Sequence, residues 1–159
     1  MISLIGEYES TIDLKGRFLL PSGLKKQLPE EDSATFVISR GFEKCLTLYP
    51  TQSWKPIYKE LNQKNDFDPK VREFRRIFLN GATPLELDNA GRLLLPKNLK
   101  EHASLERDIV LVSAGSKIEI WDKIKYQQLF DSFSPEAFSK LADEVMNRKA
   151  ENLFDGRVN

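Results

Sequence analysis

The stretch that decides the fold is Asp13-Leu14-Lys15-Gly16-Arg17-Phe18-Leu19-Leu20-Pro21. The same pattern returns seventy-five positions later as Asp88-Asn89-Ala90-Gly91-Arg92-Leu93-Leu94-Leu95-Pro96. The aspartate, the glycine, the arginine, two leucines and the proline recur at identical spacing, and a Leu-Lys pair follows each copy. Self-similarity at a fixed offset indicates that each copy is one supersecondary unit. Two copies are too few for a solenoid, so we predict a duplicated half-domain whose halves complete one core about a pseudo-twofold axis.

The residues around each copy predict a strand, a tight turn and a second strand. Tyr8–Ile12 alternates polar and apolar residues and is rich in strand formers. Asp13 can accept hydrogen bonds from N–H groups of the turn, and Gly16 can take the positive φ that a reversal needs. Phe18 to Leu20 is expected to run back as a largely buried strand, which Pro21 ends by starting a short helix. This arrangement leaves Arg17 at the mouth of a hairpin, pointing outward.

The remainder of the chain alternates strand and helix signals. Four more strands are predicted, two in each half, at residues 35–39, 45–49, 109–113 and 117–121. Amphipathic helices follow, capped by Thr51 or Ser53, by Asp68, by Asp122 and by Ser134. We expect the apolar face of the helix at 68–81 to be spare and to serve contacts between subunits. Strands followed by helices in each half predict an α+β fold.

These elements divide the chain into four expected segments. Residues 1–65 form the first repeat with its helix, and residues 66–81 form a connecting basic helix. Residues 82–150 form the second repeat with the C-terminal helices. Residues 151–159 are expected to be a disordered tail.

Composition limits the classes of function. The chain has 159 residues and a formal net charge of zero, which counts against a protein that binds nucleic acid over its whole surface. Any DNA contact must come from local clusters. Cys45 is the single cysteine, which excludes an intrachain disulfide and suits a reducing cytoplasm. No apolar run reaches the roughly 18–20 residues of a membrane span, and residues 1–7 lack the basic start of a signal peptide.

The doubled motif resembles the MraZ family of bacterial transcriptional regulators, which are built from two SpoVT-AbrB-type repeats. Two copies of Asp-x-x-Gly-Arg-x-x-x-Pro at this spacing carry the resemblance, each followed by a strand, a turn and a strand that ends in an aromatic residue. The stretch Arg72-x-x-Arg75-Arg76-Ile77-Phe78-x-x-Gly81-Ala82 is also similar to the family. The likeness runs from about residue 7 to about residue 130.

The resemblance implies a fold, a partner and an assembly. The fold would be a two-repeat, swapped-hairpin (AbrB/MraZ-like) β-barrel with flanking helices. The protein would form a homo-oligomer, in this family a ring. It would bind double-stranded DNA at short direct repeats in the promoter of the division and cell-wall gene cluster. A cytoplasmic, nucleoid-associated transcription regulator follows, with either sign of regulation open.

The resemblance places the DNA-contacting arginine on Arg17, with Arg92 as its counterpart in the second copy. Lys15 beside Arg17 is expected to hold a phosphate, whereas the second copy has Ala90 at that position. The remaining motif residues shape the turns: Asp13, Gly16, Asp88 and Gly91. A purely structural alternative is that each aspartate pairs with the arginine of its own turn and stabilises the hairpin. The two interpretations are compatible, because such a pair also orients the arginine.

The sequence also bears on other classes of function. An enzyme is not expected, because Cys45 and His102 fall at different positions of the two repeats and no third orienting group accompanies them. No cofactor and no metal site is expected, because Gly-rich phosphate loops and Cys/His metal spacing are missing from the sequence. Two alternatives stay open: an oligomeric scaffold without promoter reading, and an AbrB-like antitoxin.

Overall fold

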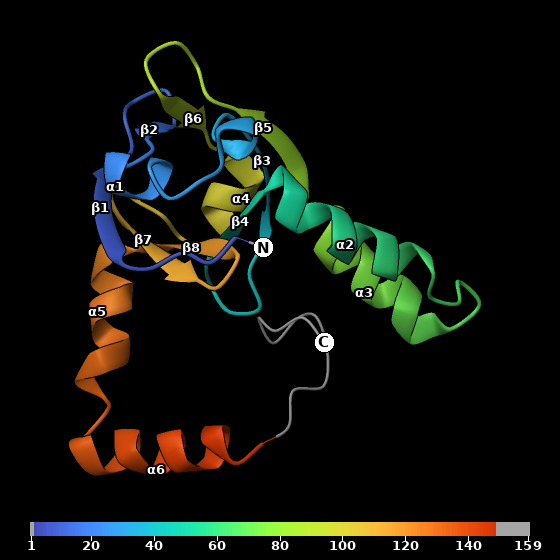
Figure 1. Ribbon diagram of the computed structural model, residues 1–159, viewed down its shortest axis with the longest axis vertical. Coiled ribbons are helices and arrows are strands. Elements are labelled where there is room, and N and C mark those ends of the chain that lie inside the picture. Colours follow the sequence, from blue (N-terminus) through green and yellow to red (C-terminus); the bar gives the residue numbers. More distant parts are fainter. Residues whose placement is uncertain (1, 149–159) are drawn as a thin grey trace.

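The computed structural model describes residues 2–148 (Figure 1). The first repeat contains β1 (Glu7–Thr11), β2 (Arg17–Leu19), α1 (Ser22–Lys25), the 3-10 turn η1 (Glu30–Asp32), β3 (Thr35–Arg40), β4 (Leu46–Pro50) and α2 (Thr51–Asn62). The helix α3 (Pro69–Leu79) leads to the second repeat: β5 (Thr83–Glu86), β6 (Arg92–Leu94), α4 (Lys97–His102), β7 (Asp108–Ala114), β8 (Lys117–Asp122), α5 (Lys123–Asp131) and α6 (Pro135–Met146). The predicted α+β class is confirmed. The expected tail at 151–159 lies outside the described residues.

The strand order carries the internal symmetry of the sequence. One antiparallel sheet has the order β1-β7-β8-β4-β3-β5, and a second sheet pairs β2 with β6. Exchanging each strand for its counterpart in the other repeat reverses the first order and leaves the second unchanged. A pseudo-twofold axis therefore passes between β4 and β8 and between β2 and β6. Among the described residues, strand pairing is divided between these two sheets, so hydrogen bonding does not close the expected barrel.

The strand–turn–strand units are exchanged between the repeats. We expected Tyr8–Ile12 and Phe18–Leu20 to pair with each other as a hairpin, and that local pairing is wrong except for one bridge, between Ile12 and Phe18. β1 pairs instead with β7 of the second repeat, and β2 pairs with β6. Each of these two strands pairs along its whole length with a strand of the other repeat, whereas the turn between them lets them share one bridge with each other. Each half thus contributes edge strands to the other.

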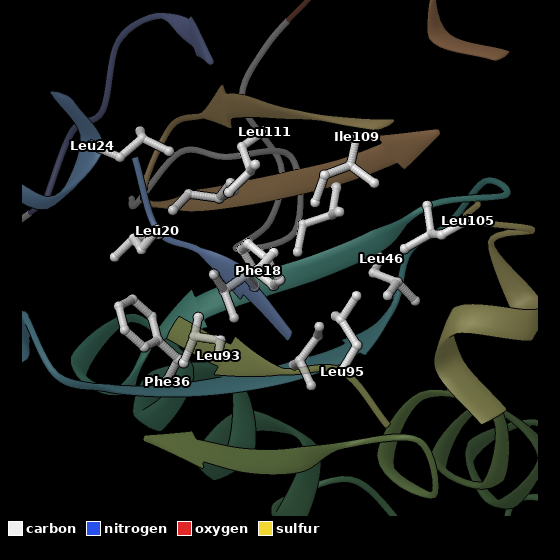
Figure 2. Close-up of a cluster of buried hydrophobic side chains, with 14 of the residues drawn as sticks. Phe18, Leu20, Leu24, Phe36, Leu46, Leu93, Leu95, Leu105, Ile109 and Leu111 are labelled. Carbon is white, nitrogen blue, oxygen red and sulfur yellow. The ribbon is translucent and has the colours of Figure 1, made fainter. Parts of the chain in front are cut away.

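The main core lies between the two sheets and draws on both repeats (Figure 2). Phe18 and Leu93 enter it from β2 and β6, where they are 1% and 0% exposed. Their neighbours come from equivalent places in the two halves: Leu20 and Leu95, Leu24 and Leu99, Ile38 and Leu111, Leu48 and Ile120. Burial of this apolar surface is the main stabilising contribution to the fold.

A second core lies on the opposite face of the same sheet. Val37 and Tyr49, paired across β3 and β4, face α2 and α3. Trp54, Ile57 and Leu61 of α2 and Phe78 of α3 complete it. Because α3 packs here, its apolar face is partly used within the chain, contrary to our expectation that it is spare. The two helices lie side by side in Figure 1.

The helix starts were mostly predicted correctly. The side chain of Asp68 accepts a hydrogen bond from the N–H of Lys70, and that of Ser134 accepts one from Ala137. Asp122 caps α5 in the same way. The expected cap of α2 by Thr51 or Ser53 is wrong, since Pro50 occupies the N-cap and no side chain caps the helix.

The two C-terminal helices leave the sheets. α5 descends from β8, and α6 lies apart from the rest of the protein (Figure 1). Every residue of α6 is exposed. Within residues 2–148, none of the helices combines the length and apolar character that spanning a bilayer requires.

Candidate nucleic-acid interface

The first turn is built around the carboxylate of Asp13. Its Oδ1 accepts hydrogen bonds from the N–H groups of Lys15 and Arg17, both at 2.9 Å. Its Oδ2 accepts one from Nε of the Arg17 guanidinium at 2.9 Å. The N–H of Asp13 donates to the carbonyl of Arg17 at 2.8 Å, which closes the turn. One aspartate therefore fixes both the backbone of the turn and the direction of the arginine.

The second turn repeats this geometry. Oδ1 of Asp88 accepts from the N–H groups of Ala90 and Arg92, and its Oδ2 accepts from Nε of Arg92 at 2.9 Å. The backbone bond from Asp88 to Arg92 measures 2.9 Å. The pairing of aspartate and arginine that the sequence suggested is present in both copies.

The glycines of the two turns have a conformational role. Gly16 has φ of +88° and Gly91 has φ of +80°. L-residues with a side chain rarely adopt this region, because Cβ meets the backbone there. The prediction that these glycines permit the reversal is confirmed.

The pairing of β2 with β6 brings the two arginines to one surface. Arg17 lies opposite Leu94 and Leu19 lies opposite Arg92, so these four side chains share one face of the two-stranded sheet. We call these four residues the outer face. Phe18, opposite Leu93, points to the core. From strand spacing, the Cα atoms of Arg17 and Arg92 are about 8 Å apart.

Two apolar residues of the outer face were missed. The sequence interpretation took Phe18 to Leu20 as a largely buried strand, yet Leu19 and Leu94 are 55% and 56% exposed. The period of two in a strand would have found them, because Leu19 alternates with the buried Phe18 and Leu20. On the outer face, Arg17 and Arg92 therefore lie diagonally across from each other, and so do Leu19 and Leu94.

The electrostatics of the turns favour ionised carboxylates. The hydrogen bond from the backbone N–H of Arg17 is the largest influence lowering the pKa of Asp13 below its usual 3.8, and the Arg17 side chain adds to it. Asp88 is shifted in the same direction by Arg92. At a pH above the usual pKa of 3.8, both aspartates are ionised and stabilise their turns. This contribution to folding stability is lost as the pH falls through the lowered pKa.

The arrangement leaves part of each guanidinium available. Within residues 2–148, the hydrogen bond from Nε to the aspartate is the one side-chain bond of Arg17, and the same holds for Arg92. The Nη groups, which carry four of the five N–H donors of arginine, have no partner there. The Arg17 and Arg92 side chains are 27% and 32% exposed. Each turn thus presents an oriented cation to the solvent beside the apolar Leu14 or the polar Asn89.

The other basic residues singled out by the sequence lie elsewhere. Arg75 pairs with Asp66 and Asn62, and Arg72 donates to the carbonyl of Asp66 at 2.9 Å. These contacts tie α3 to the loop before it, on a different part of the molecule from the outer face. Lys15 is exposed at the tip of the first turn.

Cys45 is buried, and burial raises the pKa of its thiol to about 12, which keeps it protonated at neutral pH. In residues 2–148, His, Cys, Asp and Glu form no group of three or more suited to a metal ion.

Comparison with known proteins identifies the two halves. The family model described as "MraZ protein, putative antitoxin-like" matches residues 3–77 and again residues 78–149. The transcriptional regulator MraZ of Christiangramia forsetii is 46% identical over 157 residues, which is 98% of this chain and 99% of that protein. The same-named proteins of Cytophaga hutchinsonii and Heliobacterium modesticaldum are 43% and 34% identical, over 89% and 90% of this chain and 93% and 96% of theirs. These relatives are named as regulators and not as enzymes. The chain belongs to the MraZ family of transcriptional regulators, with one copy of the family's repeat in each half.

Proposed function

We propose that this protein is a sequence-specific DNA-binding regulator that reads direct repeats in the promoter of the division and cell-wall gene cluster. The observation that carries the proposal is the outer face, where Arg17 and Arg92 are each held by an aspartate and keep their Nη groups available. Binding takes place in the cytoplasm, at the nucleoid. The reading residues are Arg17 and Arg92, Lys15 holds a phosphate, and Asp13 and Asp88 orient the arginines.

The chemistry follows from the shape of the guanidinium. Arginine presents a rigid fork that bonds O6 and N7 of guanine in the major groove, and each good pair gives about 1–3 kcal/mol of discrimination. An aspartate on Nε fixes the plane of the fork before DNA arrives, so less side-chain entropy is lost on binding. Leu19 and Leu94 are placed to contact apolar groups of the groove such as a thymine methyl.

A single outer face provides few contacts, so the proposal includes a homo-oligomer. Tandem sites on one DNA raise the effective concentration for each further subunit, which increases affinity without new chemistry. The described chain offers a surface for assembly on α6, where Phe138, Leu141, Val145 and Met146 are exposed at helical spacing.

We propose that α6 of one copy packs on α3 of the next. α6 is acidic through Glu136, Asp143 and Glu144, whereas α3 is basic through Lys70, Arg72, Arg75 and Arg76. Ile77 of α3 is also exposed, at 57%. Because two different surfaces meet, the contact is head-to-tail and generates a ring if the rotation closes.

The wild-type protein is expected to shift DNA that carries the direct repeats upstream of its own gene cluster, and to shift a scrambled duplex of equal length far more weakly. A mobility-shift assay at physiological salt measures this. Equal binding to both duplexes would contradict sequence-specific reading. If the assembled protein shows no salt-sensitive binding to DNA, the scaffold alternative is favoured.

Replacing Leu141 by Asp is expected to break the assembly, because the contact would bury the new carboxylate among apolar side chains. Light scattering at micromolar concentration should give an oligomer for the wild type and a monomer for the variant. Asn147→Asp places the same charge at the end of α6, on the side opposite Phe138 and Leu141, and serves as the control. A wild-type monomer, or equal disruption by both variants, would remove the proposed contact.

A further inference from the structure

We propose that the two turns are unequal and that the DNA backbone lies against the first, where Arg107 from the second repeat holds a phosphate beside Arg17. This inference rests on the proposed function and adds a binding residue to it. It also assigns a direction to each subunit on its site.

The strand register makes the comparison between the turns strict. The residue before each turn aspartate donates a backbone hydrogen bond across to the other repeat. Ile12 donates to the carbonyl of Arg107 at 2.8 Å, and Leu87 donates to that of Ala34 at 2.9 Å. Arg107 and Ala34 therefore occupy equivalent positions, one beside each turn. Both residues are exposed.

A second pair of equivalent positions also has a cation at the first turn and an alanine at the second. Lys15 at the tip of the first turn corresponds to Ala90 in the second. Two cations at the first turn are thus two alanines at the second. The loop that leads to Ala34 also carries Glu30 and Glu31, both exposed, which add negative charge on the side of the second turn. DNA phosphates are therefore attracted to the basic residues at the first turn and repelled by the acidic residues near the second.

The first turn borders a surface cleft of about 630 Å³. It is lined by residues 11–14 of the first repeat together with Lys100, Glu106 and Arg107 of the second. The charge of Asp13 is matched by its bond to Arg17, and Glu106 offsets one of the two cations. Positive charge remains in excess there, and Lys15 adds to it at the rim.

The inequality breaks the pseudo-twofold symmetry of the fold. A symmetric pair of turns would fit a palindrome, in which both orientations of a subunit are equivalent. A subunit with one basic and one acidic flank has a single preferred orientation on the duplex. Repeated in a ring, that orientation requires sites that point the same way, which are direct repeats.

The test compares matched residues of the two repeats. Lys25 in α1 and Lys100 in α4 follow equivalent leucines in the two copies of the motif, and each replacement by Ala removes one charge. We expect Arg107→Ala and Lys100→Ala to weaken binding to the repeats. The slope of log K against log salt concentration should fall by about 0.9 for each subunit on the DNA. Lys25→Ala should leave that slope unchanged. Thermal unfolding checks that all three variants fold.

Equal slopes for Lys25→Ala and Lys100→Ala, or an unchanged slope for Arg107→Ala, would overturn the inequality of the turns. Either result leaves the proposed function in place, provided the wild type prefers the repeats to scrambled DNA. If the wild type shows no such preference, the proposed function fails first. Every variant is assayed with both duplexes. Loss of a phosphate contact weakens binding to both duplexes equally, whereas loss of sequence reading weakens binding to the repeats alone, so the two failures are distinguished.

Discussion

Replacing Arg17 by Ala is expected to weaken binding to the promoter repeats by roughly 10-fold to 100-fold for each subunit, because a bidentate arginine–guanine pair contributes about 1–3 kcal/mol. The effect grows when several subunits bind one DNA, because each loses its contact. Arg92→Ala should cost less, since the second turn lacks the neighbouring cations Lys15 and Arg107. Fluorescence anisotropy with labelled repeats measures all of these affinities.

The matched control for Arg17→Ala is Lys44→Ala, which removes the same charge from an exposed position between β3 and β4. It should leave binding nearly unchanged. The fold should survive Arg17→Ala, because an exposed ion pair contributes little to stability. If Arg17→Ala binds as tightly as the wild type, or if Lys44→Ala loses as much affinity as Arg17→Ala, the reading residue has been wrongly assigned.

Replacing Phe18 by Ala is expected to destabilise the protein by about 3–5 kcal/mol, because it leaves a cavity where both sheets meet. The side chain is 1% exposed and lies opposite Leu93, which is 0% exposed. For a chain of this size the midpoint of thermal unfolding should fall by roughly 6 to 20 °C. Calorimetry or circular dichroism measures the shift.

Leu19→Ala is the control for Phe18→Ala, since the neighbouring side chain is on the outer face. It should lower the unfolding midpoint by no more than a degree or two, about as other exposed substitutions do. A loss as large as that of Phe18→Ala would mean that the outer face is covered, and the proposed interface with DNA would have to be abandoned.

Local chemistry made much of the structure predictable from the sequence. Turn formation depends on residues within five positions of one another, so Asp13 with Gly16 was enough to specify each reversal. The same holds for the caps at Asp68 and Ser134, where a side chain bonds to an N–H two or three residues away. The doubled motif then predicted the duplicated half-domain.

Non-local pairing was not predictable in the same way. Nothing within residues 7–20 determines that β1 pairs with β7 or that β2 pairs with β6, because the apolar pattern suits any partner with a buried face. The proximity of Arg107 to the first turn follows from that exchange and has no local signal. The exposure of Leu19 did have one, the alternation along β2, but the run of apolar letters concealed it.

The central claim, that Arg17 reads a base through its fork, is tested most directly by Arg17→Lys. Lysine keeps the charge but lacks the planar pair of donors. The ratio of affinities for the direct repeats and for a scrambled duplex should fall by roughly 10-fold or more, while affinity for the scrambled duplex stays close to that of the wild type. A variant that discriminates between the two duplexes as well as the wild type does would contradict the account.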